Sequence, residues 1–170
     1  MPTVRTWDEL FEGCEFEAVH LELRDRYDVD DEYFADWLAG RLTAATHAGR
    51  WSSFCSTVAA ATARGVQVRR LRVVSMPASE YIRYEHAGTP ATVRSGEEVR
   101  WLDRAAAPDV HLPITDLWVF DRSLVRWNIF NGDDRFLRFD DVEDPGLAAR
   151  LVDSFDSAWK RGVPHQDFVI

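Results

Sequence analysis

Apolar and polar side chains alternate along several short segments, which predicts β-strands. In residues 15–24, Val19 and Leu21 share one parity while His20 and Glu22 share the other, as in a half-buried strand. A valine-rich run at 66–74 suits an interior strand, although its arginines show that it is not apolar on both sides. The predicted strands are residues 15–24, 66–74, 97–103, 116–121, 124–130 and 135–139, the last two joined by the hairpin signal Asn131-Gly132.

Apolar positions spaced three or four residues apart predict the helices. The closing helix is the best marked, because Asp144 suits its N-cap, Pro145 its first position, and Gly162 its end. The other predicted helices start at Asp30-Asp31-Glu32 and end at Gly40, run from Trp51 to Arg64-Gly65, and run from Ser79 to His86. Gly88, Pro90 and Gly96 are expected to form a turn region, and residues 1–13 a flexible polar lead-in.

This succession of elements predicts an α/β fold in which helices flank a mixed β-sheet. The 170 residues suit one domain, 1–170, with a substantial core. The order of the strands within the sheet does not follow from the pattern.

Composition narrows the classes of partner. The formal net charge is −9, which disfavours polyanions, so we expect no direct nucleic-acid partner and no membrane surface. Two cysteines, no charged leader and no apolar run of ~20 residues predict a cytoplasmic protein with reduced thiols. The five histidines are scattered without metal-ligand spacing, so we expect no metal and no cofactor.

Two aspartates flank an apolar strand in L-P-I-T-D-L-W-V-F-D, residues 112–121. Asp116 and Asp121 are five residues apart, which puts them on opposite faces and ~16 Å apart along a strand. Paired glycosidase carboxylates lie roughly 5–9.5 Å apart, so these two do not form a catalytic pair. Asp121 is interpreted as the first residue of the turn Asp121-Arg122-Ser123, where it accepts local backbone hydrogen bonds. Asp116 needs a partner if buried, and we expect an arginine or a tyrosine.

Polar and aromatic residues gather after the strand at 66–74, where clefts form in α/β folds. We expect this cleft to bind a small polar ligand or a partner, with Asp116 as acceptor, aromatic rings as walls and arginines as counter-ions. The alternative is a structural ion-pair network that joins Arg72 or Arg83 to Glu85 or Asp116. The candidate residues are Arg72, Ser75, Tyr81, Arg83, Tyr84, Glu85, Asp116, Trp118 and Asn131.

Two segments resemble phospholipase D-like domains: S-T-V-A-A-A-T-A-R-G-V-Q-V-R-R-L-R-V-V and E-D-P-G-L-A-A-R-L-V-D-S-F-D-S-A-W. Those enzymes carry His-x-Lys-x4-Asp-x6-Gly-Ser-x-Asn. With the motif aspartate on Asp121, Ile114 replaces the histidine nucleophile, Asp116 replaces the lysine, and Asn131 matches the asparagine. The resemblance implies a degenerate half-unit without phosphodiester chemistry, a pseudoenzyme, and a homodimer as one expected assembly.

The whole chain is similar to an actinobacterial family of unknown function. The similarity is carried by L-E-L-R-D-R-Y, R-V-V-S-M-P-A-S-E-Y-I-R-Y-E and D-L-W-V-F-D. Members are often encoded beside helix-turn-helix transcription regulators, so the resemblance implies such a regulator as partner. No catalytic residue carries over from it.

Two functions follow as hypotheses. The first is a non-enzymatic regulatory or ligand-sensing domain that works with a partner protein through the degenerate cleft. The alternative is a hydrolase that uses Asp116 as general base, which predicts a raised pKa for Asp116 in an enclosed polar pocket.

Overall fold

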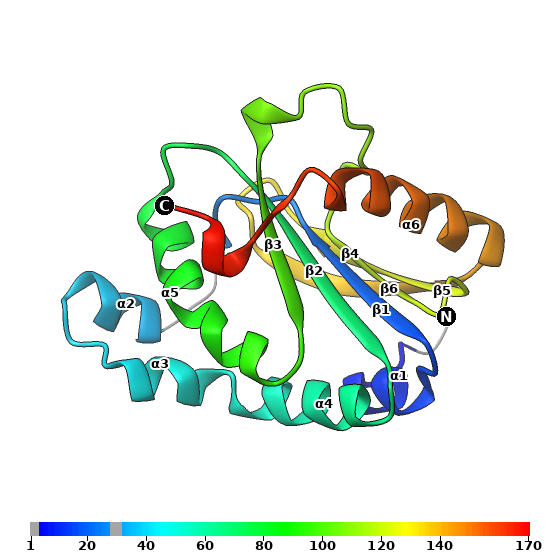
Figure 1. Cartoon of the computed structure of the whole chain (residues 1–170), viewed down its shortest axis with the longest axis horizontal. Coiled ribbons are helices and arrows are strands. Elements are labelled where there is room, and N and C mark those ends of the chain that lie inside the picture. Colours follow the sequence, from blue (N-terminus) through cyan, green and yellow to red (C-terminus); the bar gives the residue numbers. More distant parts are fainter. Residues whose placement is uncertain (1–3, 28–31) are drawn as a thin grey trace.

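The computed structural model describes residues 4–27 and 32–170. They form a mixed seven-stranded sheet in the order β6-β5-β4-β1-β2-β3-β7, with helices on both faces (Figure 1). The predicted α/β class with a mixed sheet flanked by helices is confirmed.

Three parallel strands form the centre of the sheet and an antiparallel meander extends it. The parallel strands are β1 (Glu17–Glu22), β2 (Gln67–Val74) and β3 (Glu98–Asp103). The meander consists of β4 (Leu117–Phe120), β5 (Leu124–Phe130) and β6 (Phe136–Glu143), and β4 runs antiparallel to β1. The two-residue strand β7 (Val163–Pro164) pairs with β3.

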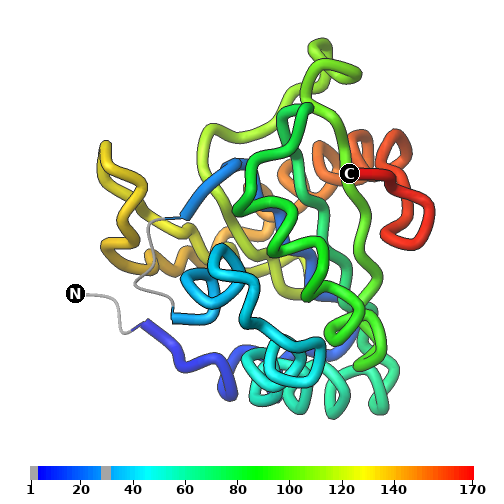
Figure 2. Tube along the Cα trace, turned by 90° about the vertical axis from the view of Figure 1, so that its left-hand side faces the viewer, coloured from blue at the N-terminus to red at the C-terminus, as the bar shows by residue number. Residues whose placement is uncertain are grey.

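One helix covers one face of the sheet and the remaining helices lie on the other side (Figures 1 and 2). Helix α6 (Pro145–Trp159) packs alone against Val19, Leu21 and Leu71. The opposite side carries α1 (Trp7–Gly13), α2 (Glu32–Leu38), α3 (Ala44–Arg50), α4 (Ser52–Ala63) and α5 (Glu80–Arg94). Short 3-10 turns occupy Arg104–Ala106 and His165–Asp167. No helix in the described ranges is long and apolar enough to cross a membrane.

Side-chain caps set several helix starts. The predicted N-cap Asp144 accepts a hydrogen bond from the Leu147 amide at 2.9 Å, so the start of α6 is confirmed. The predicted lead-in is partly wrong, because Thr6 and Glu9 form a capping box that begins helix α1 within it. The predicted start of α2 at Asp30-Asp31 lies outside the described residues.

The prediction that the strand at 15–24 is half-buried is wrong. Val19 and Leu21 face α6, whereas Ala18 lies in the cluster under α1 and α4. Helices therefore cover both sides of β1, and the polar side chain of His20 is only 6% exposed.

The predicted turn at Gly88 and Pro90 is also wrong, because α5 continues through both residues. A Cβ atom at Gly88 would lie 2.5 Å from His47 Nε2, so this glycine permits close packing of α3 on α5. Gly96, with φ of +103°, does follow the end of α5 as a turn residue. The Asn131-Gly132 hairpin is confirmed, with Asn131 Oδ1 accepting from the amides of Asp133 and Arg135.

Candidate ligand-binding site

Polar side chains from two neighbouring strands lie on the sheet face under α1 and α4. His20 and Glu22 belong to β1, and Arg70 and Arg72 belong to the parallel strand β2. The register pairs His20 with Arg70 and Glu22 with Arg72, so the four side chains form a compact polar floor.

A cavity of about 580 Å³ lies over this floor, which we call the sheet-face cavity. Aromatic side chains from the helices and from the outer strands form most of its walls, and a volume of this size suits a small organic ligand. The walls include Trp7, Phe11, Tyr27, Trp51, Phe54, Tyr81, Trp118, Phe130, Phe136 and Phe139.

The arginines of the floor are already paired with carboxylates. Arg72 Nη2 lies 2.9 Å from Glu85 Oε2 on α5, and its Nε lies 2.8 Å from Glu22 Oε2. Arg70 Nε lies 2.9 Å from Glu97 Oε1. The alternative of a structural network that joins Arg72 to Glu85 is therefore present, and these cations are not left over as counter-ions for an anionic ligand.

His20 is a buried polar residue whose ring lacks a hydrogen bond to any described part of the chain. Its ring stacks on Trp118 at a centroid distance of 4.0 Å, and Nε2 lies 3.8 Å from Glu22 Oε1. Neither ring nitrogen has a hydrogen-bond partner within residues 4–27 and 32–170. Burial, followed by the charges of Arg70 and Arg72, holds the pKa of His20 well below its usual range, so the imidazole is neutral at pH 7.

Other polar atoms of residues that line the cavity also lack a complete set of hydrogen bonds within the described residues. Asn128 Oδ1, from β5, has no hydrogen-bond partner in the described part of the chain. The contact of Arg72 Nε with Glu22 Oε2 is an ion pair without the alignment of a hydrogen bond. Buried polar groups in this condition are rare in native proteins, so a ligand or water is expected to complete them.

Asp116 is 1% exposed and forms one end of the cavity. Its Oδ1 accepts from the Leu23 amide at 3.0 Å, and its Oδ2 accepts from the Tyr27 hydroxyl, which is a tyrosine partner as expected. Burial above all raises the pKa of Asp116 to about 6, and the nearby Glu22 raises it further against the hydrogen bonds.

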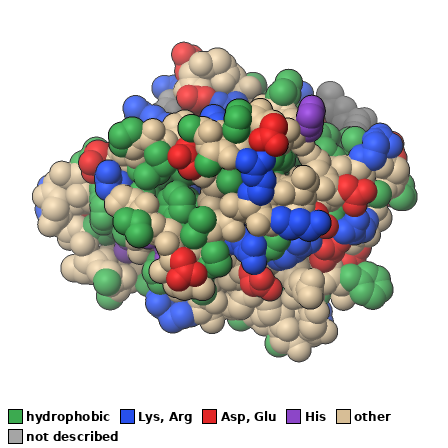
Figure 3. Space-filling view, turned by 45° about the horizontal axis from the view of Figure 1, so that its top comes forward, with side chains coloured by type: hydrophobic (Ala, Val, Ile, Leu, Met, Phe, Trp, Pro, Cys, Tyr) green, Lys and Arg blue, Asp and Glu red, His purple; other side chains and the backbone are tan. Residues whose placement is uncertain are grey.

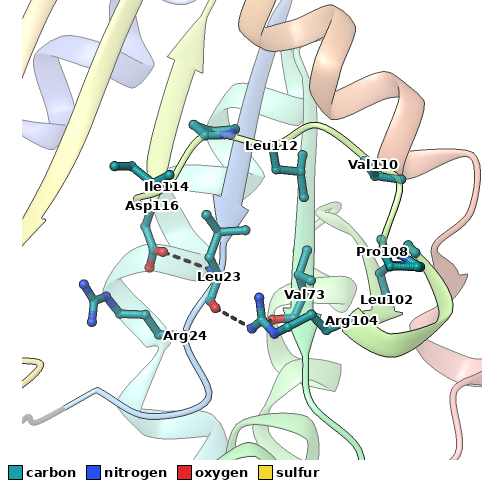
Figure 4. A pocket seen from close by; sticks show the side chains of 12 residues that line it. Leu23, Arg24, Val73, Leu102, Arg104, Pro108, Val110, Leu112, Ile114 and Asp116 are labelled. Carbon is teal, nitrogen blue, oxygen red and sulfur yellow. Dashed lines mark hydrogen bonds between the residues drawn. The ribbon is translucent and has the colours of Figure 1, made fainter.

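Asp116 also borders a second cavity of about 520 Å³, the strand-end pocket, which Figure 4 shows. Leu23, Val73 and Leu102 line it where the parallel strands end, and residues 107–114 form its far wall. Arg104 donates to the carbonyl oxygens of Leu23 and Val73 at 2.6 and 3.0 Å, which ties the ends of β1 and β2 together.

The structure brings five of the nine predicted site residues together. Arg72, Tyr81, Glu85, Asp116 and Trp118 all line the sheet-face cavity.

The other four lie away from it. Ser75 is exposed and donates to Asp25, and Asn131 supports the hairpin turn. Tyr84 is buried against the ring of His47, and Arg83 is half-buried and does not line the cavity.

The sequence reasoning missed His20, Glu22, Arg70 and Asn128. The alternation of His20 and Glu22 with apolar residues is visible in the sequence, but a half-buried strand would turn both toward solvent, and no pattern marks Arg70 or Asn128 as site residues. The helices α1 and α4 cover this face of the sheet and bury His20.

Asp121 is a turn residue as predicted, but the expectation that its hydrogen bonds are local is wrong. Its carboxylate accepts hydrogen bonds from the amides of Glu15, Phe16 and Glu17 at 2.8–3.0 Å, and its φ is +50°. These bonds lower the pKa of Asp121 although burial opposes them. The bonds come from the segment before β1, so Asp121 joins two distant parts of the chain.

Ile114, the residue that the expected resemblance to phospholipase D-like domains would put in place of the nucleophile, is 100% exposed. Its side chain cannot act as a nucleophile there. Among the described residues no group of three or more histidine, cysteine, aspartate or glutamate side chains is arranged to hold a metal ion.

Comparison with known proteins identifies a family and a fold. The model of a family described as a domain of unknown function (DUF6879) matches residues 5–170. No curated protein matches the sequence. The chain is similar to the solved structure of TrmBL2, an archaeal chromatin protein described as showing a novel mode of DNA binding, with 14% identity and a TM-score of 0.50. The match covers 91% of this chain and 47% of that one, so this chain spans about half of its length.

The expectation that nucleic acid is excluded as a direct partner is wrong. A protein with this fold is described as binding DNA, and a net charge of −9 is an average over the whole surface. Figure 3 shows Lys and Arg side chains gathered beside Asp and Glu on one face, so the local charge departs from that average.

Proposed function

We propose that this chain, which belongs to the DUF6879 family of domains of unknown function, is a regulatory domain that senses a small molecule in the sheet-face cavity. The observation that carries the proposal is His20, whose neutral ring is buried beside the cavity without a hydrogen-bond partner in the described residues. A folded protein keeps such a group at a cost of about 1–3 kcal/mol, which a bound ligand would offset.

The surroundings of His20 favour binding over catalysis. The arginines of the floor are neutralised by Glu22, Glu85 and Glu97, and the phospholipase D-like scaffold that we propose lacks the histidine and lysine of its motif. Aromatic walls around a small polar floor are typical of ligand sites.

The regulatory part of the proposal draws on the chromatin protein with the same fold. This chain corresponds to about half of that protein. We propose that the ligand-sensing domain likewise serves a DNA-associated system, in which occupation of the cavity changes the association with DNA.

Native mass spectrometry of the chain purified from its own cells tests ligand binding. We expect a stoichiometric small-molecule adduct. Ser53→Trp, in the cavity wall on α4, should remove it by filling the space, whereas Ser56→Trp, exposed one turn along the same helix, should retain it. An adduct that survives in Ser53→Trp, or no adduct in any preparation, contradicts the proposal.

Cross-linking in those cells tests the regulatory part. We expect DNA to be recovered with the cross-linked chain, and the recovered amount to differ between Ser53→Trp and Ser56→Trp. Equal recovery of DNA from the two variants would show that occupation of the cavity does not change the association with DNA.

A hydrolase that uses Asp116 as general base is a second candidate. The pKa of about 6 suits a base near neutral pH, and Asp116 borders two cavities. It predicts turnover of para-nitrophenyl esters or phosphodiesters that Asp116→Asn abolishes. No turnover by the unmodified chain would eliminate this candidate for those substrates.

A further inference from the structure

The chemistry of the sheet-face cavity narrows the class of ligand, on the premise that the cavity is the sensing site proposed above. Three properties bear on the class of ligand. They are the charges around the floor, the polar atoms that lack hydrogen-bond partners in the described residues, and the separation of the cavity into a polar floor and aromatic walls.

The balance of charge disfavours an anion. Arg70 and Arg72 form ion pairs with three glutamates at 2.8–2.9 Å. An anion in the cavity would also face the half-buried carboxyl group of Glu22 and the buried one of Asp116, which would repel it when ionised. An anionic ligand would therefore lose its hydration without gaining a free cation.

The same floor disfavours a cation at its centre. Arg70 is the cross-strand neighbour of His20 in β2, and Arg72 lies two register pairs further along, on the same face of the sheet. Because Glu22, Glu85 and Glu97 are each already paired with one of these arginines, a cationic ligand bound against His20 would lose its hydration without gaining a free carboxylate from them. An uncharged ligand meets neither penalty.

The unpartnered atoms call for a ligand with hydrogen-bond donors. Asn128 Oδ1 and one nitrogen of the neutral His20 ring are acceptors without a hydrogen-bond donor in the described residues. The other His20 nitrogen is a donor without an acceptor there. The complementary edge of a ligand therefore carries N–H or NH2 groups together with an acceptor.

The walls distinguish a flat ring from a polyol. A cyclic polyol carries hydroxyl groups around its whole rim, and each one needs a partner when buried. Phe11, Phe54, Phe130 and Phe139 offer none, so the polar side chains elsewhere in the lining, such as Asp8, Ser53 and Thr57, could satisfy only part of such a rim. A planar heterocycle confines its polar atoms to its edge and leaves two faces that stack on aromatic rings.

We infer that the ligand of the sheet-face cavity is an uncharged, planar nitrogen heterocycle with N–H or NH2 donors along one edge, of the nucleobase or nicotinamide class. Its polar edge faces His20, Glu22 and Asn128, and its ring faces lie against the aromatic walls.

Isothermal titration calorimetry of the full chain tests this inference with defined probes. The uncharged heterocycles are adenine, cytosine, uracil and nicotinamide, the anionic relatives are orotate and nicotinate, and the polyols are glucose and myo-inositol. We expect saturable binding of at least one uncharged heterocycle, and at least tenfold weaker binding of both anions and both polyols. This comparison requires no variant.

A variant then tests whether the best-binding heterocycle contacts the polar floor of the cavity. His20→Phe keeps a ring for stacking on Trp118 but removes both nitrogens, and should weaken binding of the best heterocycle about tenfold or more. The matched control His111→Phe changes an exposed histidine outside the cavity and should bind as the unmodified chain does. Circular dichroism establishes that both variants fold.

Several results would overturn the inference. They are an anion or polyol that binds as tightly as the best heterocycle, no binding by any of the four heterocycles, or unchanged binding in a folded His20→Phe chain. If the native mass spectrum nevertheless shows an adduct that Ser53→Trp removes, the cavity still senses a ligand, and only the chemical class assigned to it fails.

Discussion

The Tyr27 hydroxyl donates a hydrogen bond to Asp116, and this contact closes one end of the sheet-face cavity. The two residues are far apart in sequence, and the Tyr27 ring also packs on Phe130 and Tyr81. The burial that this packing produces is the main cause of the raised pKa of Asp116. Several measurable consequences follow from this site and its supports.

Asp116 makes the stability of the protein depend on pH. Its pKa is about 6 when folded, against an ordinary value of 3.8, so the folded state binds more protons than the unfolded state between these values. Stability from this group is therefore present below pH 3.8 and is lost as pH rises through 6, by about 3 kcal/mol at most. Asp116→Asn should remove this loss, so its stability relative to the unmodified chain should rise between pH 4 and pH 7. Urea unfolding at both pH values measures the change, and a constant difference would contradict it.

His20 gives the free energy of unfolding the opposite dependence on pH. Its pKa is depressed in the folded state, so the unfolded state binds the proton first as pH falls below 6.5. The unmodified chain should lose up to about 1.4 kcal/mol per pH unit from this group below that value. His20→Phe should flatten the profile between pH 7 and pH 5, while His111→Phe should not. Thermal unfolding across this range gives the comparison, and identical slopes for the two variants would be inconsistent with a buried neutral imidazole.

The ion pairs beneath the cavity should depend strongly on Arg72. Of the arginine contacts in the described residues, Arg72→Met leaves Glu22 only that to Arg70 at 3.6 Å and Glu85 only that to Arg50 at 3.2 Å, which should cost up to about 3–5 kcal/mol of unfolding free energy. Arg138 and Asp140 form an exposed pair at 2.9 Å, so Arg138→Met should cost less than about 1 kcal/mol. Urea unfolding compares the two variants. Similar losses of stability in the two variants would mean that Arg70 and Arg50 compensate Glu22 and Glu85 for the missing Arg72.

Gly88 should tolerate no side chain, in contrast to a second helical glycine. Gly88→Ala brings a methyl group against the buried His47 ring, which is itself stacked on Tyr84, and should destabilise by about 1–3 kcal/mol. Gly49→Ala, in α3 with open space around it, should stabilise by about 0.5–1 kcal/mol. Opposite signs in thermal unfolding are the expected result, and a stabilising Gly88→Ala would contradict this packing of α3 on α5.

Sequence patterns were sufficient where local physics decides the structure. The Asp144 cap and Pro145 predicted the start of α6, and Asn131-Gly132 predicted the hairpin, because the hydrogen bonds involved join residues only a few positions apart. Alternating residues likewise predicted β1, and a valine-rich run predicted β2. The pattern failed at Gly88, where the reason for glycine is a neighbouring helix rather than a turn.

The sequence by itself determined the α/β class and the strands that carry the polar floor, because side-chain alternation follows from the pleat of each strand. It could not determine that β1 lies between β4 and β2, since this order joins segments far apart in the chain. That placement puts His20 between Trp118 and Arg70, and the helices α1 and α4 then cover it. The tertiary structure alone therefore turned an expected solvent-facing histidine into the buried, unpartnered group at the candidate site, because burial depends on what covers a strand and not on its own sequence.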